Sequence, residues 1–273
     1  MSAPRASVVI PAHDEEGYIE QTLRTLLADA EPGEFKVVVV CNGCVDGTAD
    51  KARQVPGVQV VEIPDASKIT ALNEGDRRTD HFPRIYLDGD VVLSTYAARD
   101  LSDSLAAGDA LVAGIPGRYS LDEVPLGVQL FYEFRQRLPV FADGIIGAGV
   151  YALSAEGRAR FGEWPKILGD DQFVFRLFAA EERAVLRHHA TLVEPAPDLR
   201  TVVRRGVRVR RGNQELSDGA AGVPHLAPPS AGFGTALRAS LRSPRGWLSA
   251  AVFTAVTLVT RARSLVARSS GWS

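Results

Sequence analysis

Two carboxylates separated by one glycine, Asp88 and Asp90, stand out in the run Tyr-Leu-Asp-Gly-Asp. Hard divalent cations take oxygen ligands, and Mg²⁺ is commonly held by one or two carboxylates together with substrate phosphates. Gly89 between them permits a tight backbone and the close approach of a ligand. The pattern predicts a cation site for a phosphorylated ligand, and an ordinary Asp-Gly turn is the alternative interpretation.

A second pair of carboxylates, Asp170 and Asp171, directly precedes apolar residues at helical spacing. A positioned carboxylate can remove the proton from a hydroxyl group while that hydroxyl attacks. Carboxylates in the first turn of a helix are also favourable for a purely structural reason, because they cap free N–H groups and face the positive end of the helix dipole. From the residues alone, the pair can be either a general base or a helix cap.

The elements that must position these carboxylates alternate along the first part of the chain. Short apolar runs predict strands at residues 7–11, 35–41, 58–63 and 84–87. Helical spacing fills residues 16–27, 48–55 and 68–78. Such alternation implies right-handed crossovers and a mostly parallel sheet with helices on both faces. Ligands of these sheets bind at the carboxyl ends of the strands, so polar residues that follow a strand carry particular weight.

The pattern is weaker in the second half. We expect a helix over residues 128–137, a glycine-led strand over residues 147–154 and a helix from residue 170 to residue 178. The predicted organisation is an α/β domain over residues 1–216, divided near residue 118 into two halves (1–118 and 119–216). A Gly-, Ala- and Pro-rich linker over residues 217–234 and a basic, apolar helical extension over residues 235–273 follow.

Four ordered blocks of polar residues follow the predicted strands, at residues 11–16, 41–48, 67–73 and 86–90. Together with Asp170-Asp171, they resemble the family 2 glycosyltransferases, whose fold is called GT-A, over about residues 7–216. The resemblance implies an inverting, metal-dependent transfer of a sugar from a nucleotide diphosphate donor to a hydroxyl acceptor. It implies Mn²⁺ or Mg²⁺ as the cofactor and a UDP-sugar as the default donor, with GDP and dTDP donors open.

The resemblance also implies roles for individual residues. Nucleotide contacts are expected from Pro11, Ala12, His13, Glu15, Asn42, Asp46, Lys68, Asp88 and Gly89. Asp90 and Asp88 are expected to bind the metal, and Gly147, Ala148 and Gly149 to line the acceptor side. The expected catalytic carboxylates are Asp171, as the general base, and Asp170. Two positions depart from the family pattern. Asn42 stands where many members have aspartate, which leaves the nucleotide base open, and Asp170 stands where most have glutamate.

An arginine cluster lies between residues 200 and 211. The guanidinium fork suits phosphate because it donates two parallel hydrogen bonds. The resemblance implies that basic residues here contact the donor diphosphate, and we expect Arg208 and Arg211 to do so. A solvated basic face is the alternative. The cluster contains no aromatic residue for base stacking, which disfavours RNA binding. The net charge of −2 likewise gives no general attraction to nucleic acid, so no nucleic-acid partner is predicted.

The C-terminal extension combines positive charge with an apolar run. Residues 219–273 contain no Asp or Glu, and the run at residues 247–260 is flanked by Arg245, Arg261 and Arg263. The run is shorter than the roughly 20 residues needed to span a bilayer. We expect either a helix that packs on the body of the protein or on a partner, or an interfacial helix with its arginines at lipid headgroups. A partner or peripheral membrane contact through residues 245–263 is the favoured interpretation. The acceptor class (lipid-linked, glycan or small molecule) and homo-oligomer formation stay open.

Cys41 and Cys44 are the only cysteines in the sequence. Two thiols cannot build a disulfide framework, which predicts a reducing, cytoplasmic location, with the inner face of the cell membrane as the site of any peripheral contact. Their Cys-x-x-Cys spacing after a strand is also found in thioredoxin-like redox proteins. Two rival functions therefore accompany the transferase hypothesis. They are a catalytically degenerate GT-A module that binds nucleotide sugars, and a redox protein.

Overall fold

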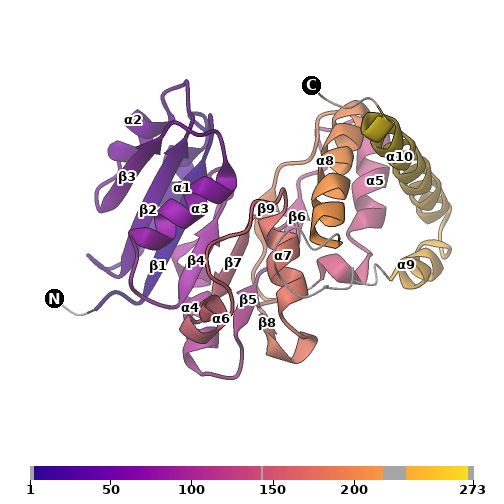
Figure 1. Cartoon of the computed structure of the whole chain (residues 1–273). Helices are drawn as coiled ribbons and strands as arrows, with labels where there is room; N and C mark the ends of the chain where they lie inside the picture. Colours follow the sequence, from indigo (N-terminus) through magenta and orange to yellow (C-terminus); the bar gives the residue numbers. More distant parts are fainter. Residues whose placement is uncertain (1–2, 143, 218–231, 270–273) are drawn as a thin grey trace.

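The computed structural model describes residues 3–142, 144–217 and 232–269. Within these residues, one sheet has seven strands in the order β3-β2-β1-β4-β7-β5-β8, and a second sheet pairs β6 with β9 (Figure 1). The mixed, mostly parallel α/β architecture predicted from the sequence is confirmed. Most of the predicted linker, residues 218–231, lies outside the described residues.

The first half of the sheet is parallel throughout. Its strands are β1 (Ala6–Ala12), β2 (Phe35–Asn42), β3 (Val58–Ile63) and β4 (Arg84–Leu87). Its helices are α1 (Ile19–Leu27), α2 (Thr48–Arg53), α3 (Lys68–Arg77) and α4 (Thr95–Ala106). The first strand continues one residue beyond Pro11, where the sequence predicted its end, because Pro11 and Ala12 stay in register with β2.

Neighbouring residues of β1 pack on opposite faces of the sheet, and both faces are covered. Val8 and Ile10 belong to a buried cluster with residues of α1, α2 and α4. Val9 belongs to a second cluster that contains Ile69 and Leu72 of α3. A strand covered on both sides has no face for polar residues, which explains its continuous apolar sequence.

The second half inserts an antiparallel strand into the sheet. Its strands are β5 (Val112–Gly114), β6 (Gly117–Tyr119), β7 (Val150–Leu153), β8 (Arg183–Val185) and β9 (Thr191–Val193). Its helices include α5 (Leu126–Arg135), α6 (Ala155–Ala159) and α7 (Asp170–Leu177). Strand β7 runs antiparallel to both β4 and β5. The chain therefore enters β7 at the edge where β4 ends, beside Asp88.

The described C-terminal residues form α8 (Leu199–Ser217), α9 (Phe233–Ser240) and α10 (Pro244–Ser269). Helix α10 packs against α5 and α8, on the side of the molecule away from β1, β2 and β3 (Figure 1). The predicted C-terminal helical extension is thus present as α9 and α10. Across the described part of the chain, no helix has the length and apolarity required to cross a membrane.

Glu34 ties the start of β2 to α4 through Arg99. Its two carboxylate oxygens accept hydrogen bonds from Arg99 Nε (2.7 Å) and Nη2 (2.8 Å), and its side chain is only 9% exposed. These hydrogen bonds, more than any other contact, lower the pKa of Glu34 to about 2. Because the folded-state pKa lies below the ordinary value of 4.5, the pair stabilises the fold above that pH and loses its effect as the pH falls towards 2.

We expect Glu34→Gln to lower the free energy of unfolding by about 1–2 kcal/mol near neutral pH. The deficit relative to the parent should shrink as the pH is lowered through the acidic range, because the parent then loses the same ion pair. Urea unfolding at a series of pH values measures this difference. Glu123→Gln, on an exposed residue of the β6–α5 connection, is the control and should show no deficit. A deficit that does not change with pH would contradict the assignment.

Candidate functional site

The Asp88-Gly89-Asp90 turn begins where β4 ends. Its first amide, Asp88 N–H, donates to the carbonyl of Gly149, 2.8 Å away, so the turn is joined to the segment that enters β7. A Cβ on Gly89 would lie 3.3 Å from both Ala12 Cβ and Glu15 Cγ. Gly89 is therefore closely packed against the end of β1, and the close approach of a ligand to it stays a prediction.

Lys68 bridges two carboxylates from different halves of the chain. Its Nζ lies 2.7 Å from Asp88 Oδ1 and 2.9 Å from Asp170 Oδ1. Burial lowers the pKa of Lys68, but the charges of Asp170 and Asp88 outweigh burial and raise it well above its ordinary value. Burial also raises the pKa of Asp88, an effect that Lys68 opposes. We take the lysine as charged because two carboxylates face it. Lys68 thus connects the predicted cation site to the predicted catalytic carboxylates, Asp170 and Asp171.

Asp170 is the buried member of its pair, with 5% of its surface exposed. One oxygen accepts from Lys68 and the other, Oδ2, accepts from the Tyr151 hydroxyl at 2.8 Å. Burial, followed by the charge of Asp170, raises the pKa of Tyr151 well above 10, so the phenol stays a hydrogen-bond donor. Tyr151 was missed from the sequence, where its only signal is a position two residues after Gly149.

Asp171 is held by backbone amides at the start of α7. Its Oδ2 accepts from Gly147 N–H at 2.9 Å and its Oδ1 from Gln172 N–H at 2.7 Å. Burial, followed by the neighbouring charge of Asp170, raises the pKa of Asp171. The side chain is only partly buried, in contrast to that of Asp170. Of the two carboxylates, Asp171 is the one that a ligand can reach.

The segment predicted to line the acceptor side, residues 147–149, takes a conformation that requires glycine. Gly147 and Gly149 have φ values of 65° and 69°, in the left-handed region that other residues rarely adopt. The sequence predicted a strand from residue 147, but β7 begins only at Val150 because these two glycines turn the chain. Ala148 between them is buried, and its carbonyl accepts from Thr191 Oγ1 at 2.8 Å. The segment is therefore fixed beside both Asp88 and Asp171.

Several carboxylates gather at the carboxyl ends of β1, β2 and β4. Burial, followed by repulsion from Asp90, Asp88 and Asp46, raises the pKa of Glu15 to about 7. Asp46 is also a structural residue, since its Oδ1 accepts from Thr48 N–H at 3.0 Å at the start of α2. Asp90 is exposed. The residues predicted as separate blocks thus converge, and their mutual repulsion favours a bound cation.

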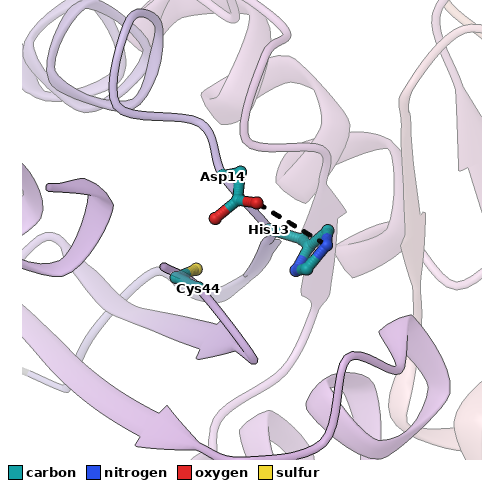
Figure 2. A group of neighbouring side chains, drawn as sticks. All are labelled: His13, Asp14 and Cys44. Atoms are coloured by element: carbon teal, nitrogen blue, oxygen red, sulfur yellow. Dashed lines mark ion pairs between the residues drawn. The ribbon is translucent and has the colours of Figure 1, made fainter. Parts of the chain in front are cut away.

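The loops after β1 and β2 are joined by polar side chains. Figure 2 shows His13, Asp14 and Cys44 grouped together, with ligand-type atoms that all lie within 4.8 Å of one another. His13 Nδ1 lies 2.6 Å from the carbonyl oxygen of Asn42, and Cys44 Sγ donates to the carbonyl of Ala12 at 3.4 Å. Asn42 itself is buried, at 4% exposure. The two predicted blocks therefore meet, and Asp14 and Cys44, which lie inside these blocks but were given no role of their own, are part of the contact.

The environment of Cys41 does not suit a redox centre. Catalytic thiols act as thiolates and have lowered pKa values. Cys41 is buried, and burial together with the nearby Cys44 raises its pKa to about 12. Its thiol stays protonated at neutral pH, which weighs against the redox hypothesis.

The predicted diphosphate-binding arginines lie on α8, which passes close to the start of α7. A Cβ on Gly212 would lie 3.1 Å from Leu168 Cβ and 3.4 Å from Gly169 N, directly before the carboxylate pair. Arg211 precedes that glycine and is partly buried, while Arg208 lies one turn earlier and is exposed. The helix is thus near the site, and the contact of both arginines with phosphate stays a prediction.

Comparison with known proteins identifies the family. The sequence model described as glycosyl transferase family 2 matches residues 7–154, more than half of the chain. The chain belongs to this family, and it is a glycosyltransferase. A search of curated proteins finds no match.

Solved structures show the same fold at low sequence identity. The mannosyltransferase PcManGT from Pyrobaculum calidifontis, in complex with GDP-Man and Mn²⁺, is 18% identical with a TM-score of 0.64, over 100% of this chain and 77% of its own. TarS 1–349 from S. aureus, in complex with UDP, is 15% identical with a TM-score of 0.54, over 94% of this chain and 91% of its own. Glucosyl-3-phosphoglycerate synthase from Mycobacterium tuberculosis is 19% identical with a TM-score of 0.54, over 80% of each chain. These likenesses establish the GT-A fold.

Proposed function

We propose that the protein transfers a hexosyl group from a nucleoside diphosphate donor, a UDP-sugar by default, to a hydroxyl acceptor with inversion. The observation that carries this proposal is that the structure has two distinct pairs of carboxylates, and that Lys68 contacts one member of each pair. Asp88 and Asp90 lie at the end of β4, while Asp171 lies at the start of α7. One set suits the charged donor, and the other suits the acceptor hydroxyl.

The first set has the chemistry of a divalent cation site. Asp90 is exposed, and Asp88, whose Oδ1 lies 2.7 Å from Lys68 Nζ, carries a second carboxylate oxygen, Oδ2. Oxygen donors of this kind fit Mn²⁺ or Mg²⁺. The PcManGT complex contains Mn²⁺, and the mycobacterial synthase has been crystallised with Mn²⁺ or Mg²⁺ and UDP. When bound here, the cation would supply positive charge against the leaving diphosphate. We propose Asp90 as its principal ligand.

Arginines and loop residues complete the proposed donor site. Arg208 and Arg211 supply further positive charge to the diphosphate from α8. The base contacts the surface formed by His13 and Asn42, where the amide oxygen of Asn42 can accept a base N–H. Because Asn42 stands where many family members have aspartate, the identity of the base has to be determined by experiment.

The second set supports removal of a proton from the acceptor. As the acceptor oxygen forms its bond to the anomeric carbon, its proton passes to Asp171, and the bond to the diphosphate oxygen breaks with its electron pair on that oxygen. Asp170 positions the site, because Lys68 and Tyr151 already occupy its two oxygens. One displacement suffices, so no covalent enzyme intermediate forms. The acceptor lies along Gly147–Gly149 in this proposal.

A ligand screen tests the proposal and identifies the nucleotide. We expect UDP, GDP or dTDP to raise the melting temperature in the presence of Mn²⁺, since a ligand that binds the native state stabilises it. The matching nucleotide sugar should then be consumed, by transfer or by slow hydrolysis. Tight binding without turnover on any acceptor or hydrolysis of the donor would favour the degenerate binding module. The absence of a shift with every nucleotide would contradict the proposed donor site.

A further inference from the structure

Helix α10 has one face packed on the body of the protein. The helix lies against α5 and α8, and Val256 joins a buried cluster with Val128 of α5 and Val202 of α8. Arg245 near its start is paired with Glu133 of α5 at 2.6 Å. The residues that face inward share low exposure: Ser249, Ala250, Val256, Thr260 and Ser264. The helix is therefore anchored, and its opposite face is held in a fixed orientation.

The outward face of α10 is apolar from Trp247 to Leu265. Its large side chains are exposed by about half or more: Trp247 (59%), Leu248 (57%), Leu258 (60%), Val259 (46%) and Leu265 (55%). Exposed alanines fill the stripe between them, at Ala251, Ala255 and Ala262. The outward face of a packed helix is normally polar. A continuous apolar stripe of this length marks a surface that contacts something other than water.

Exposed apolar residues also extend beyond the start of α10. Leu241, in the turn after α9, is 37% exposed. It lines a surface pocket with Arg242, Pro244, Trp247 and Leu248. The stripe on α10, this pocket and the arginine beside it form one surface, which we call the α10 face.

Positive charge borders the α10 face. With the helical repeat, Arg261 and Arg263 fall on opposite edges of the apolar stripe, and both are exposed. Arg242 is exposed at the other end of the helix. Residues 219–273 contain no acidic residue that could neutralise these arginines from within the extension. An apolar stripe with a tryptophan and flanking arginines matches the chemistry of a helix that lies in a lipid interface.

We propose that the α10 face docks on an anionic lipid surface, with α10 parallel to the membrane plane. This inference does not depend on the reaction proposed above. The charge distribution favours lipid over a second copy of the chain. Arginines stand near both ends of the stripe, so either parallel or antiparallel pairing of two α10 helices would bring like charges together. An anionic headgroup layer opposes them with negative charge, while the acyl region accepts Trp247 and Leu258.

Sedimentation of the full chain with lipid vesicles tests this inference. We expect binding to phosphatidylcholine vesicles that contain phosphatidylglycerol, weaker binding to pure phosphatidylcholine, and weakening by salt. Leu258→Glu should reduce the partition coefficient about tenfold or more, because it places a charge in the apolar stripe. Replacing Arg261 or Arg263 by glutamine should reduce partition to anionic vesicles about fivefold each.

A matched variant separates docking from a general effect of added charge. Leu192→Glu changes an equally exposed leucine (55%) on β9 and should partition like the parent. Melting temperature and circular dichroism should be unchanged in both leucine variants, since both side chains are exposed. Absence of vesicle binding by the parent, or equal partition of Leu258→Glu and Leu192→Glu, would overturn the inference. So would sedimentation equilibrium showing a dimer that Leu258→Glu dissociates, which would assign the face to a second copy.

Discussion

Replacing Asp171 by asparagine should lower the rate of sugar transfer by a factor of about 10²–10⁴, the range typical for loss of a general base. An amide has nearly the size of a carboxylate and can still accept the Gly147 N–H through its oxygen. It cannot take up the proton of the acceptor hydroxyl. Donor binding should be retained, because the cation and diphosphate are assigned to Asp90 and the groups around it. The loss should therefore appear in the chemical step.

Single-turnover transfer assays and calorimetric donor titrations, performed on the same preparations, check this prediction. Asp109→Asn, on an exposed residue in the α4–β5 connection, is the matched control and should behave as the parent. If Asp171→Asn transfers sugar as fast as the parent, Asp171 is not the base. If donor affinity falls together with the rate, the residue serves the donor site instead.

Replacing Asp90 by alanine should remove the part of donor binding that depends on Mn²⁺. A ligand at about 100 times its Kd stabilises the native state by about 2.7 kcal/mol. For a domain of this size, that stabilisation corresponds to a rise in melting temperature of roughly 5–10 °C. We expect most of this rise to vanish in the variant, because Asp88, the other carboxylate of this turn, is already paired with Lys68. The fold should be intact, since the side chain of Asp90 is exposed.

The measurement compares melting temperatures of parent, Asp90→Ala and the control Asp109→Ala, with nucleotide alone, Mn²⁺ alone and both together. The predicted result is a cooperative shift with both ligands in the parent and in the control only. An undiminished shift in Asp90→Ala would mean that the cation is held elsewhere. A variant with a lower melting temperature before any ligand is added would indicate a structural role for Asp90, and circular dichroism would show it.

The central strands could be predicted from the sequence because both of their faces are buried, which requires apolar residues at every position. Val8 and Ile10 face one set of helices, and Val9 faces another. Residues of a strand buried on both faces must all be apolar, so a continuous apolar run bounded by polar residues identifies it. The parallel order then places the residues after each strand at one edge. The sequence alone therefore predicts that Glu15, Asp46 and Asp90 lie close together.

The contacts between the two halves could not be predicted from the sequence. They depend on β7 running antiparallel beside β4, a long-range pairing that local patterns do not specify. This pairing brings Tyr151 to Asp170 and joins Lys68 to both carboxylate sets. Gly89 shows the same limit in another way, because the residues packed closest to it, Ala12 and Glu15, are distant in the sequence.

A crystal structure of the protein grown with Mn²⁺ and the nucleoside diphosphate that binds most tightly would test the account most directly. Anomalous scattering locates the Mn²⁺ ion without reference to any assumption about its ligands. The account predicts an anomalous peak at coordination distance from a carboxylate oxygen of Asp90 and from the diphosphate. Among the residues that the structure describes, two other groups of metal-ligand side chains offer alternative positions, His13–Asp14–Cys44 and Asp100–His188–His189. A single peak at either of these, with none at Asp90, would contradict the account.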